Sequence, residues 1–383
     1  MGFEKKFISI YACFVFGLIL LTQIGFSQES PETVAKSSSD TSSMMPMPVK
    51  LDNGIVIPIV FTSPETRIGG GVVGVYYYRF NGEPVESRPS NVKGDIIFTQ
   101  QRQIFIQLIP QFYFGNEENF FDTEFSFIRF TDRFWGIGSQ TPVVNEEQYA
   151  NDIIRLRIGY YRRLKQAVNF GLIYHFENFT IRERKVGGLL EQGGLFIGNN
   201  GARVSGLGLA FNYDSRNNLF SPSEGVFTQL TTTLYLDLLG SQTNFYTFVI
   251  DARKYFSVID HHVIALQGYF SGAEGDAPFQ LLPRLGGNAR MRGFFEGRFR
   301  DKLFLAAQAE YRFPLVWRFG GVVFGGIGEV ASRIQQFWLP NFQISYGFGL
   351  RFSINPDEKV NLRLDFGFGK NTSGIYLTVN EAF

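Results

Sequence analysis

The sequence predicts an all-β chain that closes into an antiparallel transmembrane β-barrel of about 16 strands. Long segments alternate apolar and polar residues with period two, as do strands with one apolar and one polar face. The chain contains 43 Phe, 17 Tyr and 42 Gly, and its mean hydropathy of -0.03 is what strands with one lipid-facing side average to. Beyond the N-terminal segment there is no run of about 18 apolar residues, which excludes a bundle of membrane helices.

Residues 1–27 have the features of a secretory signal peptide. Two lysines precede an apolar run from about Phe7 to Phe26, after which the chain becomes polar. A single membrane anchor is the alternative, because the run is close to the length that spans a bilayer. The only cysteine, Cys13, lies in this segment, so a cleaved chain has no disulfide and no thiolate metal site. We therefore predict export with a cleaved signal peptide.

Residues 28–53 are predicted to be a disordered lead-in and residues 54–383 the barrel. The lead-in shows no period and is too short for a folded domain. The clearest alternation runs from Phe342 to Ile354, with aromatic and aliphatic residues on one face and Gln, Ser, Gly and Arg on the other. A large apolar face opposite a polar one indicates lipid outside and a polar lumen inside. In lipid the sheet must close, since unpaired edges would find no water.

About sixteen such segments follow one another along the chain. Their approximate centres are Ile57, Val73, Ile97, Ile106, Phe125, Ile158, Ile173, Leu209, Thr231, Ile250, Leu266, Ala307, Val323, Phe348, Leu364 and Leu377. The longest connections are residues 131–150, 182–201 and 271–300. By strand parity, these three connections are expected on the outer side of the membrane.

The third long connection contains Met291-Arg292-Gly293-Phe294 and the basic stretch Arg298-Phe299-Arg300. Here the chain resembles the barrel of the BamA/TamA outer-membrane assembly proteins, also called the bacterial surface antigen family. The resemblance covers roughly residues 54–383. Its matching pieces occur in the same order as in the family, and together they are a specific signal. The matching pieces are Asp214-Ser215-Arg216-Asn217-Asn218 with Pro222 and Gly225, Arg292-Gly293-Phe294, Glu310-Tyr311-Arg312-Phe313-Pro314-Leu315 and Glu381-Ala382-Phe383. Weaker echoes are Phe134-Trp135-Gly136-Ile137-Gly138 and Pro64-Glu65-Thr66.

The resemblance implies that Arg292, Gly293 and Phe294 form the tip of a loop between the eleventh and twelfth strands. Alternation places Glu310 on the lumen face of the twelfth strand, where the family uses such a residue to hold the loop against the barrel wall. A carboxylate can accept two hydrogen bonds from the planar arginine fork, and glycine allows a tight turn beside it. The alternative is a solvated loop arginine beside a turn glycine, with Glu310 as one more polar lumen residue.

The family also supplies an aspartate from the thirteenth strand, and this sequence departs from that pattern. Gly326 occupies the corresponding position. We therefore expect the loop to be held more weakly, or by another lumen acid such as Asp251 or Asp365.

The last strand is predicted to run from Ser373 to Phe383, with Leu377, Val379 and Phe383 on one face. A terminal aromatic residue on such a strand resembles the signal that barrel-assembly machinery reads. A glutamate interrupts the final part of the pattern, and Pro58 removes a ladder donor from the first strand. Both ends of the sheet are thus predicted to pair weakly. The resemblance implies a lateral gate at this seam, and simple fraying of the terminal strands is the alternative.

An enzymatic role, a metal site and a cofactor are not predicted. His175, His261 and His262 are the only histidines, and none accompanies a nucleophile in a recognisable setting. His175 and Glu177 share the lumen face and would be the residues to test for an enzyme. The formal net charge of +1 gives no indication of nucleic-acid binding.

The resemblance implies a non-covalent role in which proteins or lipids enter or cross the outer membrane. The expected partners are outer-membrane lipids and nascent outer-membrane proteins. Family members normally carry periplasmic POTRA domains, and the stretch from Gln28 to Gly54 leaves no room for one. We therefore expect a separate periplasmic partner or a specialised barrel. The second hypothesis is a passive channel that the loop plugs.

Overall fold

The computed structural model describes residues 49–51, 53–84, 87–192, 194–356 and 359–383. Within these residues a 17-stranded antiparallel sheet forms a closed barrel of 16 strands, to which the short β1 (Val49–Leu51) is added. The predicted fold is confirmed. The barrel strands are β2 (Gly54–Ser63), β3 (Arg67–Tyr78), β4 (Ser90–Thr99), β5 (Ile104–Phe114), β6 (Asn119–Phe134), β7 (Glu147–Lys165), β8 (Val168–Arg184), β9 (Ala202–Asp214), β10 (Gly225–Tyr235), β11 (Phe245–Ile259), β12 (His262–Gly275), β15 (Leu303–Pro314), β16 (Phe319–Ala331), β17 (Gln343–Asn355), β18 (Val360–Gly369) and β19 (Thr372–Val379).

The remaining elements lie in the connections. β13 (Arg284–Leu285) and β14 (Phe299–Arg300) pair as a short antiparallel hairpin. The 3-10 helices are η2 (Val143–Asn145), η3 (Leu189–Glu191), η4 (Asp237–Leu239), η5 (Phe279–Leu281), η6 (Ile334–Gln336) and η7 (Leu339–Asn341). No helix in the described residues is both long and apolar enough to cross a membrane.

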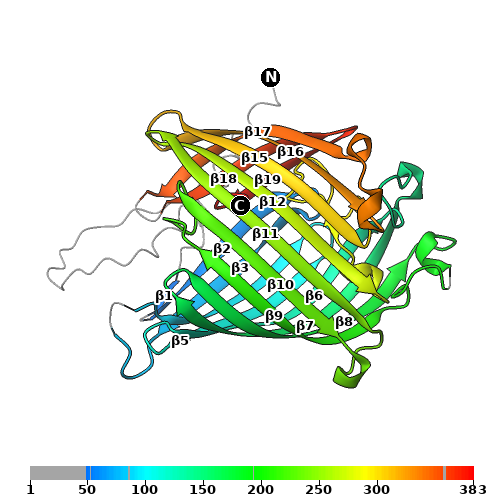
Figure 1. Cartoon of the computed structure of the whole chain (residues 1–383), viewed down its shortest axis with the longest axis horizontal. Coiled ribbons are helices and arrows are strands. Elements are labelled where there is room, and N and C mark those ends of the chain that lie inside the picture. Colours follow the sequence, from blue (N-terminus) through cyan, green and yellow to red (C-terminus); the bar gives the residue numbers. More distant parts are fainter. Residues whose placement is uncertain (1–48, 52, 85–86, 193, 357–358) are drawn as a thin grey trace, which may run out of the picture.

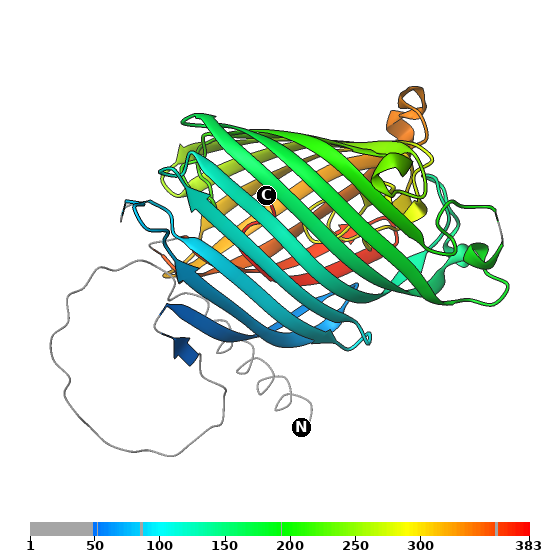
Figure 2. The ribbon, with the colours of Figure 1, turned by 90° about the horizontal axis from the view of Figure 1, so that it is seen from below.

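The strands follow one another around the wall in chain order, tilted against the barrel axis (Figures 1 and 2). Each predicted strand centre lies within one barrel strand, from Ile57 in β2 to Leu377 in β19. The reason is the period-two pattern, which fixes the face that each residue occupies. Along β17, Phe348 and Leu350 are 51% and 46% exposed on the outer face, whereas Arg351 is 5% exposed in the lumen.

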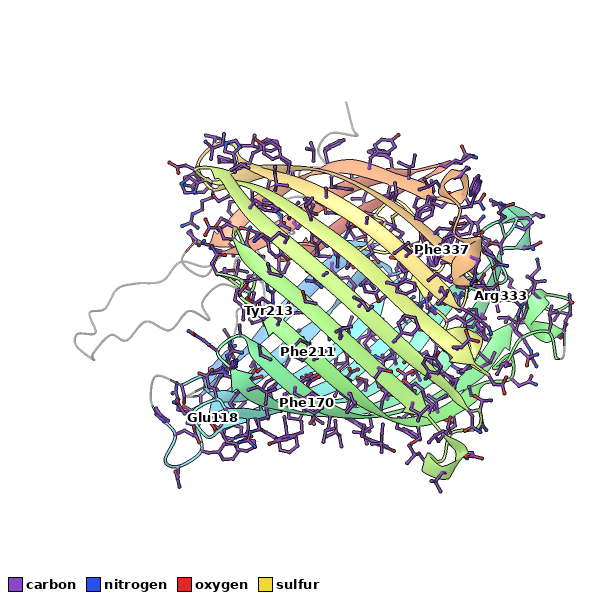
Figure 3. The ribbon with its side chains drawn as sticks, viewed as in Figure 1. Glu118, Phe170, Phe211, Tyr213, Arg333 and Phe337 are labelled. Carbon is purple, nitrogen blue, oxygen red and sulfur yellow. The ribbon has the colours of Figure 1, made fainter. Side chains whose placement is uncertain are left out.

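Aromatic residues continue the apolar outer face around the barrel. Phe170 in β8 is the cross-strand partner of Phe211 in β9, and Tyr213 follows on the same face of β9 (Figure 3). Such side chains suit the lipid-facing surface of a membrane barrel, where no water is available to a polar group.

The two ends of the barrel differ in the length of their connections. Figure 3 places Glu118, in the tight β5–β6 turn, and Arg333, in the β16–β17 connection, at opposite ends. The connections at residues 135–146, 185–201, 276–302 and 332–342 follow β6, β8, β12 and β16, the fifth, seventh, eleventh and thirteenth barrel strands, so they share one end. Parity thus groups the three long connections at one end, and their place on the outer side of the membrane stays a prediction.

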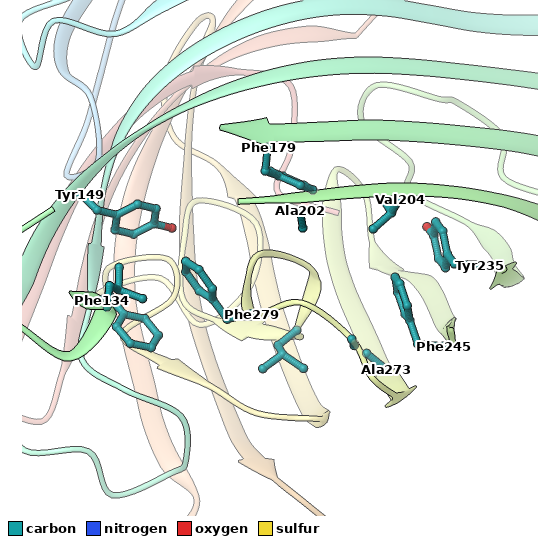
Figure 4. Packing of buried hydrophobic residues seen from close by; sticks show 12 residues of the cluster. Phe134, Tyr149, Phe179, Ala202, Val204, Tyr235, Phe245, Ala273 and Phe279 are labelled. Atoms are coloured by element: carbon teal, nitrogen blue, oxygen red, sulfur yellow. The ribbon is translucent and has the colours of Figure 1, made fainter. Parts of the chain in front are cut away.

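An apolar cluster lies where the connection between β12 and β15 packs against the barrel wall (Figure 4). Phe279, from the connection between β12 and β15, lies between Phe134 and Tyr149, with ring centroids 5.1 and 5.6 Å away. Phe279 is 1% exposed, so the wall and the connection bury it together. Tyr235 and Phe245 extend the cluster and stack with centroids 4.4 Å apart.

Two predicted boundaries differ from the structure. Val49–Leu51 fall in the predicted disordered lead-in, yet they pair with β2 as strand β1. β19 ends at Val379 instead of continuing to Phe383. The predicted signal peptide, residues 1–27, lies outside the described residues.

Candidate functional site

The connection between β12 and β15, residues 276–302, folds back into the barrel, and we call it the lumen loop. Its β13–β14 hairpin carries the segment around Arg292 inward, and Gly286 and Gly293 adopt φ values of 113° and 106° that favour glycine. Phe294 at the tip is 2% exposed in a cluster with Leu285 and Met291 of the loop and Phe304 of β15. Burial of these apolar side chains favours the inward position.

Arg292 is the centre of the contacts that the loop tip makes. Its guanidinium forms ion pairs with Glu310 of β15 and, at 2.5 Å, with Asp365 of β18. The same group lies 3.5 Å from the ring centroid of Phe324 of β16, and the Arg292 carbonyl accepts a hydrogen bond from Ser345 of β17. The arginine side chain is 1% exposed and both carboxylates are 0% exposed. One buried residue therefore ties the loop to four strands.

The acid that the sequence pattern lacked at Gly326 is supplied by a different strand. Asp365 holds Arg292 from β18, which was one of the two substitutes expected. The other, Asp251, instead pairs with Arg253 at 2.6 Å and accepts a hydrogen bond from Gln267. Arg292 thus has two carboxylate partners, and a buried charge needs such partners to offset its loss of hydration.

Gly293 lets the loop backbone touch the barrel wall. A Cβ atom at Gly293 would lie 2.6 Å from the carbonyl carbon of Phe368, and one at Gly367 would lie 2.6 Å from the amide nitrogen of Gly293. Two glycines therefore face each other where the loop meets β18. Gly293 also donates a backbone hydrogen bond of 2.9 Å to the Tyr376 hydroxyl, and its carbonyl accepts one of 2.8 Å from Thr372. Both partners belong to β19.

The loop also contacts the first hairpin of the barrel. The Glu296 amide donates to the carboxylate of Glu65, in the turn between β2 and β3, at 2.9 Å. Burial raises the pKa of Glu65 above its usual value. The loop therefore contacts β19 on one side and the β2–β3 turn on the other.

The outer part of the loop is fastened to the connection between β6 and β7. Arg298 donates to the hydroxyl and the carbonyl of Thr141, at 2.9 and 2.7 Å. Gly138 donates to the Arg300 carbonyl at 2.8 Å. Arg284 pairs with Glu296 at 2.9 Å and Asp132 at 3.7 Å, and the Glu296 carboxylate is the main reason that the pKa of Arg284 is raised. Both weaker sequence echoes, 134–138 and 64–66, thus contact this loop.

Among the described barrel strands, β2 and β19 are the neighbours with the fewest paired residues, and we call their junction the seam. β3 occupies one edge of β2 from Gly54 to Ser63. On the other edge, among the described residues, β19 contributes one register pair, Leu377 with Thr62, and β1 covers residues 54–56. Residues 57–61 have no register partner there, and Pro58 within them has no N–H to donate. This agrees with the weak pairing expected at the ends of the sheet.

The C-terminal residues do not continue the seam strand. Leu377 and Val379 lie in β19, but Asn380 adopts a φ of 66° and the chain turns into the lumen. Phe383 is 4% exposed and packs with Tyr255 and Ala265. The views in Figures 1 and 2 both place the C-terminus within the outline of the barrel. The predicted placement of Phe383 on the same strand face as Leu377 and Val379 was wrong, because the chain leaves the strand at Asn380.

The opposite wall of the lumen is polar but more open to water. Arg155 pairs with Glu124 and Arg157 with Asp122, with side chains between 21% and 30% exposed. These pairs on β6 and β7 are thus wetter than the Arg292 contacts. The lumen therefore has a dry wall under the loop and a wetter wall opposite it.

His175 and His262 each lie beside a tyrosine hydroxyl. His175 Nδ1 lies 2.7 Å from the Tyr235 hydroxyl and its Nε2 3.5 Å from the Glu177 carboxylate. His262 Nδ1 lies 2.6 Å from the Tyr311 hydroxyl, next to the turn residue His261.

Residues 130–383, more than half of the chain, match the Omp85 superfamily domain. The chain belongs to the Omp85 superfamily. The resemblance seen in the sequence is thereby confirmed, and Omp85-type barrels are outer-membrane proteins. A comparison with curated proteins finds no match.

Solved structures share this Omp85 barrel fold. BamA from Haemophilus ducreyi lacking POTRA domains 1-3 matches with a TM-score of 0.61 and 13% identity, covering 86% of this chain and 70% of that one. CdiB from Acinetobacter baumannii matches at 0.55 and 11% identity, covering 86% and 60%. CdiB from Escherichia coli matches at 0.55 and 10% identity, covering 88% and 64%. The chain thus spans about two thirds of these proteins, and identities this low establish the fold alone.

Proposed function

We propose that this barrel assists the insertion or translocation of proteins at the outer membrane, through a seam between β2 and β19 that the lumen loop keeps closed. Two features together carry the proposal. A single register pair joins β2 to β19, and the lumen loop contacts both sides of this seam. The tip holds β19 through Tyr376 and Thr372, and Glu296 holds the first hairpin through Glu65. The proposed work is non-covalent.

Membrane physics gives the seam its importance. Each unsatisfied backbone group in hydrocarbon costs several kcal/mol, so membrane barrels normally close with a continuous ladder. At the seam one register pair joins two strands whose other edges are fully paired. Separating β2 from β19 therefore breaks few backbone hydrogen bonds, whereas separating any other pair breaks a long ladder. An incoming strand could pair with the exposed groups.

The partners follow from this mechanism. An unfolded outer-membrane protein offers strands that can pair with the seam, and outer-membrane lipids surround the apolar outer face. We propose that a separate periplasmic partner captures the substrate protein and delivers it to the seam.

A passive channel is the second candidate, and the wetter wall of β6 and β7 favours it. Charged pairs such as Arg155 with Glu124 line a polar surface that the Arg292 contacts leave free. In this candidate the lumen loop is a plug and the seam has no role.

Assisted folding in vesicles tests the main proposal. The purified barrel is reconstituted, a urea-unfolded outer-membrane barrel protein is added, and its folded fraction is followed by heat-dependent gel mobility. We expect faster folding than in protein-free vesicles. In cells, depletion of the chain should lower the amount of particular outer-membrane proteins. Folding at the protein-free rate, with an unchanged outer-membrane composition after depletion, would rule the proposal out.

A further inference from the structure

Beneath the lumen loop, six buried side chains form a closed ring of alternating charge. Glu310 joins Arg292 to Arg312, which it contacts at 2.7 Å. Glu381 joins Arg312 at 3.7 Å to Arg351 at 2.7 Å. Asp365 joins Arg351 at 2.6 Å back to Arg292 at 2.5 Å. Each of these side chains is at most 8% exposed, so the charges depend on one another instead of on water.

The ring links segments that are far apart in the chain. Arg292 comes from the lumen loop, and Glu381 comes from the tail that follows β19. The tail has its own attachments, since Arg312 donates to the Phe383 carbonyl at 2.9 Å and the Glu381 amide contacts the Phe220 carbonyl at 3.4 Å. Between Arg292 and Glu381 no direct contact occurs among the described residues. β19 itself bonds the loop at Gly293 through Tyr376 and Thr372, and the Glu381 carboxylate reaches Arg292 through the ring.

From this ring we infer that Glu381 is a positioning residue for the lumen loop, so that the tail of β19 and the loop dock and release together. The inference rests on the proposed function, because it makes movement of the seam strand the event that loosens the loop. The tail continues β19 directly, so displacing that strand withdraws Glu381 from Arg312 and Arg351. These two arginines then depend more heavily on Glu310 and Asp365.

The excess of arginines over carboxylates around the ring predicts opposite effects on loop docking when an acid or an arginine loses its charge. Arg363, 3.5 Å from Asp365 and 3% exposed, adds a fourth arginine to a cluster with three side-chain carboxylates. Loss of the Glu381 charge adds net positive charge around Arg292 and weakens its docking. Loss of the Arg351 charge does the opposite, because Asp365 is then shared by fewer cations. Generic structural damage would loosen the loop in both variants.

The test measures exposure of the loop in the full chain, in vesicles and without any substrate protein. Leu285 of the loop is 0% exposed, and a cysteine placed there, with Cys13 replaced by serine, reports release through its rate of maleimide labelling. We expect Glu381→Gln to raise this rate roughly tenfold, within the range of measured couplings in buried networks. Arg351→Gln should lower the rate or leave it unchanged, and the double variant should return towards the parent rate.

The matched control is Glu124→Gln, a lumen acid on the opposite wall that pairs with Arg155. This variant should label at the parent rate, and heat-dependent gel mobility verifies that every variant is folded. A parent-like rate for Glu381→Gln overturns the inference, and so does equal loosening by Arg351→Gln without recovery in the double variant. If the variants show the expected labelling rates but the barrel does not assist folding, the coupling of tail and loop is supported and the proposed function is refuted.

Discussion

Replacing Arg292 by alanine should release the lumen loop while the barrel stays folded. The side chain makes two buried ion pairs, with Glu310 and Asp365. Removing one partner of a buried pair costs about 3–5 kcal/mol. Both carboxylates retain another arginine, Arg312 and Arg351 respectively, so we expect about 3 kcal/mol, the lower end of that range. At about 1.4 kcal/mol for each factor of ten, the ratio of docked to released loop falls roughly 100-fold.

Single-channel conductance in planar bilayers detects this release. The wild type should be nearly silent, because the loop fills one side of the lumen, and Arg292→Ala should show frequent large openings. Arg292→Lys keeps the charge but lacks the planar fork for two carboxylates, so it should fall between the two. If the wild type and Arg292→Ala conduct equally, the reasoning that makes Arg292 a latch is refuted.

Three further changes test the contacts around the loop. Gly293→Ala should destabilise the docked loop by about 1–3 kcal/mol, because φ is 106° and the added Cβ meets backbone, whereas Gly268→Ala, with open space around it, should conduct like the wild type. Burial raises the pKa of Glu65 above 4.5, so its ionised form is disfavoured in the docked state. Protonation of Glu65 should therefore help to raise the thermal midpoint as the pH falls from about 7 through the raised pKa towards about 4. Glu65→Gln should remove this pH-dependent contribution. If the midpoint depends on pH in the same way in Glu65→Gln and the wild type, the role of this carboxyl is contradicted. Phe279→Ala should cost about 3–5 kcal/mol in thermal unfolding, and Phe170→Ala on the lipid-facing side much less; equal losses would contradict the cluster in Figure 4.

The strands were predictable from the sequence because lipid and water sort their residues with period two. Every predicted centre, from Ile57 to Leu377, lies in a strand. The same periodicity placed Glu310 on the lumen face, and it is 1% exposed there. Local alternation carries this information without knowledge of the tertiary contacts.

The tertiary contacts of the site were less accessible to sequence reasoning. Asp365 was one of several lumen acids, and only the fold shows that it, and not Asp251, reaches Arg292. Tyr376 was missed, although a large aromatic residue on the small-residue lumen face of the last strand was an available signal. The inward tail was missed because the turn at Asn380 breaks a pattern that the sequence alone continues to Phe383.

Locking the seam tests the proposed gate most directly. Thr62 and Leu377 are the cross-strand partners that join β2 to β19, so cysteines at both positions, in a Cys13→Ser background, are close enough for a disulfide. The control is the same linkage between Val72 and Ile96, outward-facing partners in the continuous ladder of β3 and β4. We predict that the oxidised seam variant stops assisting substrate folding and recovers on reduction, while the control stays active throughout. Full activity with the seam disulfide formed would contradict a lateral gate between β2 and β19.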